Sequence, residues 1–137
     1  QNECIDLLKE SLKQNYEVML ETGGSLSIVD VPKEIVKIVD FKCPSSNMEK
    51  KNLWSIVNDL QPHDEVKFVI GDREDFDWAE EILNKYSLNE KCAILFSPTF
   101  GQIHPSLIVD WILDKNLPVR MQLQMHKHIW EPEEKGV

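Results

Sequence analysis

The chain has 137 residues, of which 42% are hydrophobic and 28% charged, and its net charge at pH 7 is −9. This length is that of one domain, and no apolar run approaches the roughly 20 residues that cross a bilayer. Because an acidic chain without a basic patch repels a phosphate backbone, we expect a single domain that binds neither nucleic acid nor a membrane.

The first half of the chain is predicted to contain two helices and two short strands. Apolar residues at helical spacing indicate a helix over residues 3–14 and another over residues 48–60. Short apolar runs predict a buried strand over residues 16–20 and a β-branched strand over residues 35–39.

The second half alternates strands with helices. Strands are expected over residues 65–70, 91–96 and 119–126, and helices over residues 74–86 and 105–116. Strands separated by helices of this length are typical of βαβ units, so we expect an α/β fold with a parallel sheet and outer helices. An open doubly wound sheet and part of a barrel both fit the pattern. The first reverses its strand order and the second keeps it sequential.

The last predicted strand has an unusual polar face. Apolar and polar residues alternate strictly along it, with Val119, Met121, Leu123 and Met125 on one face and Arg120, Gln122, Gln124 and His126 on the other. An arginine, two glutamines and a histidine are the hydrogen-bonding groups that a polar small molecule needs. We therefore expect this strand to form one wall of a binding cavity.

Polar segments follow the first four predicted strands: ETGGS at 21–25, DFKCPSS at 40–46, GDRE at 71–74 and SPTFGQ at 97–102. Because ligands of parallel α/β sheets bind at the carboxyl ends of the strands, these segments are expected to meet at one edge. GDRE is explained more simply by a helix cap, through Asp72 or Asp75. A solvated lysine at position 42 and an ordering turn at 97–99 are the corresponding simple explanations for two of the others.

No metal site is expected from the sequence. His126 and His128 lie two residues apart with no third ligand nearby, and Cys4, Cys43 and Cys92 are widely spaced without a CxxC motif. An odd number of unpaired cysteines indicates reduced thiols, and hence a cytoplasmic protein.

Five segments run in order along the chain: ETGGS, IVDFKCPSSNM, DEVKFVI, LFSPTFG and VRMQLQMHKHIW. Together they closely resemble the C-terminal half of the 7-carboxy-7-deazaguanine synthases. These are radical S-adenosylmethionine (SAM) enzymes of queuosine and 7-deazapurine biosynthesis. The resemblance implies an incomplete TIM-like (β/α) barrel.

The resemblance also implies an activity, that of a radical SAM carbon–nitrogen lyase. Such an enzyme uses SAM, a four-iron four-sulfur (4Fe-4S) cluster and Mg²⁺. A 5′-deoxyadenosyl radical abstracts hydrogen from 6-carboxy-5,6,7,8-tetrahydropterin, whose ring contracts to 7-carboxy-7-deazaguanine with loss of ammonia.

Site residues follow from the same resemblance, although none is assigned a catalytic role. One SAM-contacting segment falls on Asp40, Phe41 and Lys42, and a second falls on Ser97, Pro98, Thr99 and Phe100. The pterin side falls on Gln124, His126 and the terminal carboxylate of Val137. Members with Ser-Pro-Lys at the first segment and a glutamine at the start of the second differ from this chain, so contacts there are expected from the backbone.

The chain departs from the family in one respect. The CxxxCxxC loop that binds the cluster and the GGEP strand end are absent from the sequence, which begins at Gln1 rather than at methionine. We therefore expect residues 1–137 to form a single α/β domain that is the C-terminal part of the enzyme and is inactive alone. Since a barrel without its first strands has an unpaired edge, we expect a homodimer or pairing with the missing half. The alternative is a non-catalytic, flavodoxin-like domain that binds a ligand or another protein.

Overall fold

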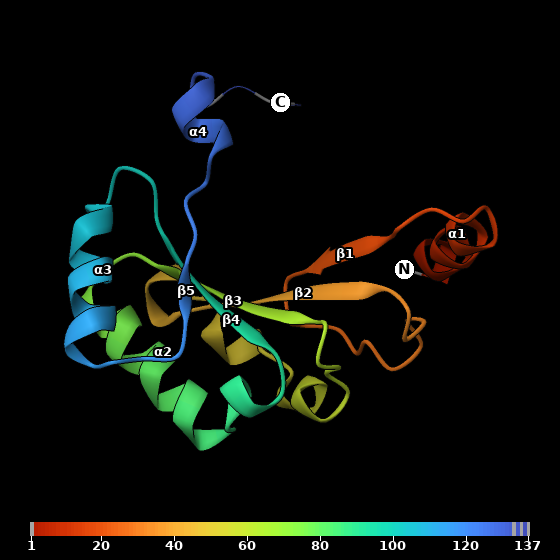
Figure 1. Ribbon diagram of the computed structural model, residues 1–137, viewed down its shortest axis with the longest axis horizontal. Helices are drawn as coiled ribbons and strands as arrows, with labels where there is room; N and C mark the ends of the chain where they lie inside the picture. Colours follow the sequence, from red (N-terminus) through yellow and green to blue (C-terminus); the bar gives the residue numbers. More distant parts are fainter. Residues whose placement is uncertain (1, 133, 135, 137) are drawn as a thin grey trace.

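The computed structural model describes residues 2–132, 134 and 136 and contains a five-stranded parallel sheet (Figure 1). The strands lie side by side in chain order: β1 (Met19–Thr22), β2 (Val36–Phe41), β3 (Glu65–Ile70), β4 (Ala93–Pro98) and β5 (Arg120–Met121). Within the described residues β1 and β5 do not pair with each other, so the sheet is an open arc of a barrel. The expected partial barrel is confirmed, and because the strand order does not reverse, the doubly wound alternative is wrong.

In the part of the chain that the structure describes, four α-helices accompany the sheet: α1 (Asn2–Lys13), α2 (Arg73–Lys85), α3 (Pro105–Asp114) and the short α4 (His126–Ile129). The same residues also form the 3₁₀ turns η1 (Pro44–Ser46), η2 (Glu49–Lys51), η3 (Trp54–Asn58) and η4 (Leu88–Glu90). Asp72 caps α2 by accepting a hydrogen bond from the backbone N–H of Asp75 at 2.9 Å, and Pro105 begins α3. The predicted helices at 3–14, 74–86 and 105–116 are confirmed within two residues at each end.

The core lies on one face of the sheet, under α2 and the 3₁₀ turns (Figure 1). Phe41, Phe68 and Phe96 come from neighbouring strands and are fully buried there, with ring centroids 6.2 Å and 5.8 Å apart. Phe76 of α2 packs against Phe96 at 5.5 Å. Because side chains alternate along a strand, the residues next to each phenylalanine in its own strand point to the opposite face of the sheet, which we call the inner face. The inner face is therefore the face of the sheet on which a ligand could bind.

Three predicted elements differ from the structure. The first strand lies at Met19–Thr22 rather than at 16–20, and it is an exposed edge strand whose Met19 side chain is 62% exposed. The predicted helix at 48–60 is replaced by the separate turns η2 and η3, because the backbone N–H of Leu53 donates to the carbonyl of Gly24 at 2.8 Å instead of to a helical partner. A tertiary hydrogen bond therefore overrides the apolar stripe.

The last predicted strand is also shorter than expected. The pairing of β5 with β4 ends at Met121. One further hydrogen bond follows, from the N–H of Gln122 to the carbonyl of Phe96 at 2.9 Å. Met125, expected on the apolar face, is exposed, and His126 begins α4. In the described part of the chain, no helix combines the length and apolarity that crossing a membrane requires.

Candidate functional site

The inner face has a hollow at the carboxyl edge of the sheet, with a volume of about 450 Å³. Its walls are formed by side chains from β1, β3, β4 and the segment after β5: Glu21, Lys67, Ser97, Gln122, Leu123, Gln124, Met125 and His126. Three residues predicted from the sequence, Ser97, Gln124 and His126, are thus brought together. The hollow forms because parallel strands end at the same edge, and the segment after β5 turns over that edge.

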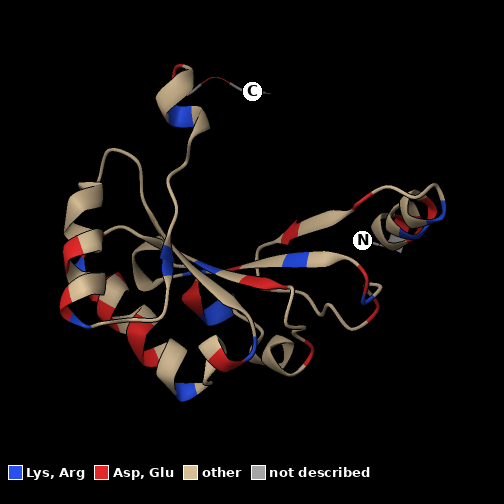
Figure 2. Ribbon diagram, in the orientation of Figure 1, with Lys and Arg blue, Asp and Glu red and all other residues tan. Residues whose placement is uncertain are grey.

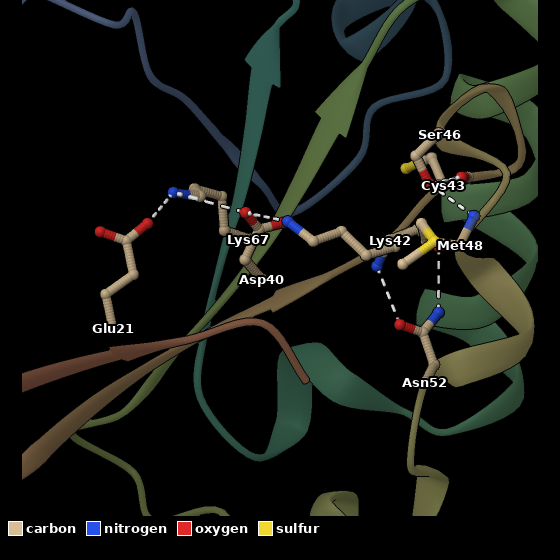
Figure 3. Close-up of polar contacts among 8 residues, drawn as sticks. All are labelled: Glu21, Asp40, Lys42, Cys43, Ser46, Met48, Asn52 and Lys67. Carbon is tan, nitrogen blue, oxygen red and sulfur yellow. Dashed lines mark hydrogen bonds and ion pairs between the residues drawn. The ribbon is translucent and has the colours of Figure 1, made fainter. Parts of the chain in front are cut away.

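A chain of ionic contacts extends across the inner face from β1 to the end of β2 (Figure 3). The ammonium of Lys67 pairs with Glu21 and lies 3.9 Å from Oδ2 of Asp40, and the ammonium of Lys42 lies 2.8 Å from the same oxygen. On the same face, Arg120 of β5 pairs with Glu65 of β3. Acidic and basic residues both occur along the strands of the sheet (Figure 2). The face is therefore charged but nearly balanced.

One oxygen of this network is left without a partner. Oδ1 of Asp40 is buried, and it accepts no hydrogen bond from any residue that the structure describes. A buried carboxylate oxygen without a donor is costly. This atom lies beside Lys42 and Lys67, and Asp40 is not among the residues that line the hollow.

The backbone at Lys42 is fixed by the side chain of Asn52. The amide oxygen of Asn52 accepts the N–H of Lys42 at 2.9 Å, and its NH₂ donates to the carbonyl of Lys42 at 3.0 Å (Figure 3). The side chain of Lys42 is 37% exposed and paired with Asp40. The ring of Phe41, by contrast, is buried in the core on the other face. Only the backbone of Phe41 is thus available to a ligand on the inner face.

The segment after β4 is fixed in a similar way. Ser97 is buried, and the N–H of Thr99 donates to the carbonyl of Ile70 at 2.8 Å. Phe100 lies at the surface with its ring 5.4 Å from the ring of His128. A second hollow of about 270 Å³ opens here, with mostly apolar walls formed by residues that include Pro98, Phe100, Gln102, Ile103, Gln124 and His128. The two hollows share Gln124, which connects the predicted segment at 97–100 with the predicted pterin side.

Val137, the remaining predicted site residue, lies outside the described residues. The structure adds Glu21, Lys67 and Asn52, which sequence reasoning missed. A lysine inside the apolar run EVKFVI was the available signal for Lys67, because a charged residue within a buried strand needs a partner.

Cys43 and Cys92 are buried and not prepared for ligation or nucleophilic chemistry. Burial, together with the nearby charges of Asp75 and Asp40, raises the pKa of the Cys43 thiol. Burial raises the pKa of the Cys92 thiol to about 11. Over the described residues, no group of three His, Cys, Asp or Glu side chains is arranged to hold a metal ion. These residues therefore do not fit an iron–sulfur cluster.

No family model matches the chain, but three relatives found by comparison with known proteins carry the same name. The chain is 36% identical over 150 residues to 7-carboxy-7-deazaguanine synthase of Koribacter versatilis, covering 100% of this chain and 66% of the relative. It is 36% identical over 140 residues to the protein of the same name from Chlorobaculum tepidum, covering 100% of this chain and 64% of the relative. For Methanospirillum hungatei the identity is 37% over 131 residues, covering 96% and 54%. The chain thus spans between half and two thirds of the length of these three relatives.

Proposed function

We propose that this chain, which is homologous along its length to the 7-carboxy-7-deazaguanine synthases, is the C-terminal part of a radical SAM carbon–nitrogen lyase. The reaction would convert 6-carboxy-5,6,7,8-tetrahydropterin to 7-carboxy-7-deazaguanine. The observation that carries this proposal is the meeting of Ser97, Gln124 and His126 around one hollow at the carboxyl edge of an open parallel sheet. An edge of this kind is where such sheets bind their ligands. With three free cysteines, the enzyme would act in the cytoplasm.

The residues at this edge fit SAM, a polar cofactor. The 40–42 segment, with its backbone fixed by Asn52, and the 97–100 segment would hold it. Bound SAM supplies the radical that removes hydrogen from the substrate.

The pterin would lie on the other side of the same hollow. Gln124 offers both a donor and an acceptor, which suits the amide-like edge of a pterin, and His126 adds a ring nitrogen. Lys67, paired with Glu21, adds an ammonium in reach of the substrate carboxylate. We further propose that Val137 contacts the pterin.

Over the described residues, no group of three His, Cys, Asp or Glu side chains is arranged to hold the 4Fe-4S cluster. We propose that the cluster is held by a CxxxCxxC segment in the part of the enzyme that corresponds to the unmatched length of the relatives.

The first test compares two proteins. One is this chain, and the other, the fusion protein, carries the unmatched part of the Koribacter versatilis relative ahead of the chain. We expect tight SAM binding under anaerobic conditions by the fusion protein with its cluster reconstituted, and weak or no binding by the chain. Flavin binding by the chain, or no SAM binding by a fusion protein with a loaded cluster, would overturn the proposal.

A further inference from the structure

The carboxylate of Asp75 connects the loops that follow β2 and β3. Asp75 lies in the first turn of α2 and is fully buried. Its Oδ1 accepts the N–H of Ser45 at 2.9 Å, and its Oδ2 accepts the hydroxyl of Ser45 at 2.5 Å and the N–H of Gly71 at 2.8 Å. This buried carboxylate thus accepts three hydrogen bonds from two different loops.

These bonds are not needed to cap the helix. Asp72 already accepts the N–H of Asp75 at 2.9 Å, which satisfies one of the free donors of the first turn. The Asp75 side chain instead bonds Gly71, which precedes the N-cap of α2, and Ser45 in the loop after β2. The buried carboxylate therefore connects these two loops.

The loop after β2 begins with Lys42, the last residue of the predicted 40–42 segment, and it is fixed at two points. Asn52 binds both backbone groups of Lys42, and Asp75 binds both donors of Ser45 three residues further on. Between them, the hydroxyl of Ser46 donates to the carbonyl of Cys43 at 2.6 Å. The path of the backbone from Lys42 to Ser46 is thus determined by side chains of two other segments.

The same carboxylate also reaches the segment after β4. It binds Gly71, whose neighbour Ile70 accepts the N–H of Thr99 at 2.8 Å. The three loops pack closely at Gly71. A Cβ built there would lie 3.0 Å from the side chain of Gln102, 3.1 Å from the hydroxyl of Ser45 and 3.2 Å from Asp75. Asp75 is therefore at the centre of the contacts that hold both predicted cofactor segments.

We propose that Asp75 is a positioning residue, which sets the geometry of the 42–46 loop and, through Gly71, of the 97–100 segment. This inference rests on the proposed function, because those segments are the ones assigned to SAM. Loss of the carboxylate would leave the strands in place and let the loops move.

The first measurement is amide hydrogen exchange in the chain itself. Asp75→Asn keeps the shape of the side chain but replaces one acceptor with a donor that faces N–H groups. We expect the amides of Ser45 and Gly71 to exchange at least tenfold faster, with the amide of Phe68 in β3 unchanged. Asp72→Ala, which removes only the helix cap, should leave Ser45 protected. Unchanged exchange at Ser45 and Gly71 in Asp75→Asn would overturn the inference.

The second measurement uses SAM affinity in the fusion protein. Asp75→Asn should weaken SAM binding at least tenfold, whereas Asp72→Ala should change it less than twofold. If Asp75→Asn does not fold, Ser45→Ala takes its place, with Ser45→Thr expected to restore affinity because it keeps the hydroxyl. Failure of the unsubstituted fusion protein to bind SAM would reject the proposed function. Normal binding by it together with normal binding by Asp75→Asn would reject the positioning role alone.

Discussion

The ammonium of Lys37 lies 3.1 Å from the carboxylate of Asp64, and both side chains are buried at the amino end of the sheet. Asp64 also accepts the backbone N–H groups of Lys37 at 2.9 Å and of Gln61 at 2.7 Å. The opposite edge carries the partly exposed chain from Glu21 to Lys42. The sheet therefore has a closed, fully paired ion pair at one end and an open polar hollow at the other.

The buried pair gives the first prediction, which concerns stability. Asp64→Ala should lower the free energy of unfolding by roughly 3–5 kcal/mol, because it leaves a buried ammonium and two backbone donors without their acceptor. Lys37→Met should cost less, since Asp64 keeps the two N–H groups. Urea unfolding followed by circular dichroism measures both values. Losses below about 1 kcal/mol for Asp64→Ala would contradict the assignment of a buried structural pair.

The second prediction concerns the two glycines after β1. Gly24 has φ +70°, and a Cβ there would lie 2.9 Å from the ring of Phe41 and 3.3 Å from the carbonyl of Asp40. Gly24→Ala should therefore lower the free energy of unfolding by about 1–3 kcal/mol. Gly23→Ala is the matched control, because a Cβ at Gly23 finds its nearest neighbour at 4.0 Å. Equal melting temperatures for the two variants would show that the close approach at Gly24 is not real.

Much of the fold was predictable because buried parallel strands are continuous apolar runs. Both ends of β3 were predicted correctly, and the neighbouring β2 and β4 were shifted by one or two residues. The helix at 48–60 was wrong for a reason that no local pattern contains. Asn52 and Leu53 use their hydrogen-bonding groups on Lys42 and Gly24, which are distant in sequence.

The site was predictable where it depends on strand ends and not where it depends on register. Ser97, Gln124 and His126 meet because they follow or end neighbouring strands. Lys67 and Asp40 are direct partners across β2 and β3, which requires the actual pairing of the strands. Phe41 is buried in the core because residues alternate between the two faces along β2. Its neighbours in sequence are therefore not in the core.

The third prediction concerns thiol reactivity. With the pKa of Cys92 raised to about 11 by burial, only about one thiol in a thousand is ionised at pH 8. Iodoacetamide at pH 8 should modify the partly exposed Cys4 first, and Cys43 and Cys92 only after unfolding. Because the unfolded thiols lose their protons at lower pH, the free energy of unfolding should fall as pH rises from about 9 to 11. Rapid labelling of native Cys92 would contradict its burial.

The fourth prediction concerns the free edge of β1. In the described residues β1 pairs only with β2, and Met19 and Tyr16 beside it are exposed. We propose that the edge is covered by a second copy of the chain or, in the complete enzyme, by its preceding strands. Sedimentation equilibrium should show a concentration-dependent dimer of the chain, weakened by Met19→Lys. A monomer at every concentration would contradict self-association.

The fifth prediction concerns the substrate side of the hollow. His126→Ala in the fusion protein should reduce turnover of the pterin at least tenfold, because a hydrogen-bonding wall of the hollow is lost. His63→Ala is the matched control. His63 is also an exposed histidine, and its ring nitrogen contacts the carbonyl of Lys33 at 2.9 Å. It precedes β3, and therefore lies at the opposite end of the sheet from the hollow. Its removal should leave turnover unchanged.

Product formation by the fusion protein tests the central claim most directly. With SAM, a reductant and 6-carboxy-5,6,7,8-tetrahydropterin under anaerobic conditions, mass spectrometry should detect 7-carboxy-7-deazaguanine from the fusion protein and none from the chain alone. A fusion protein that has its cluster and binds SAM, yet forms no 7-carboxy-7-deazaguanine, would contradict the account.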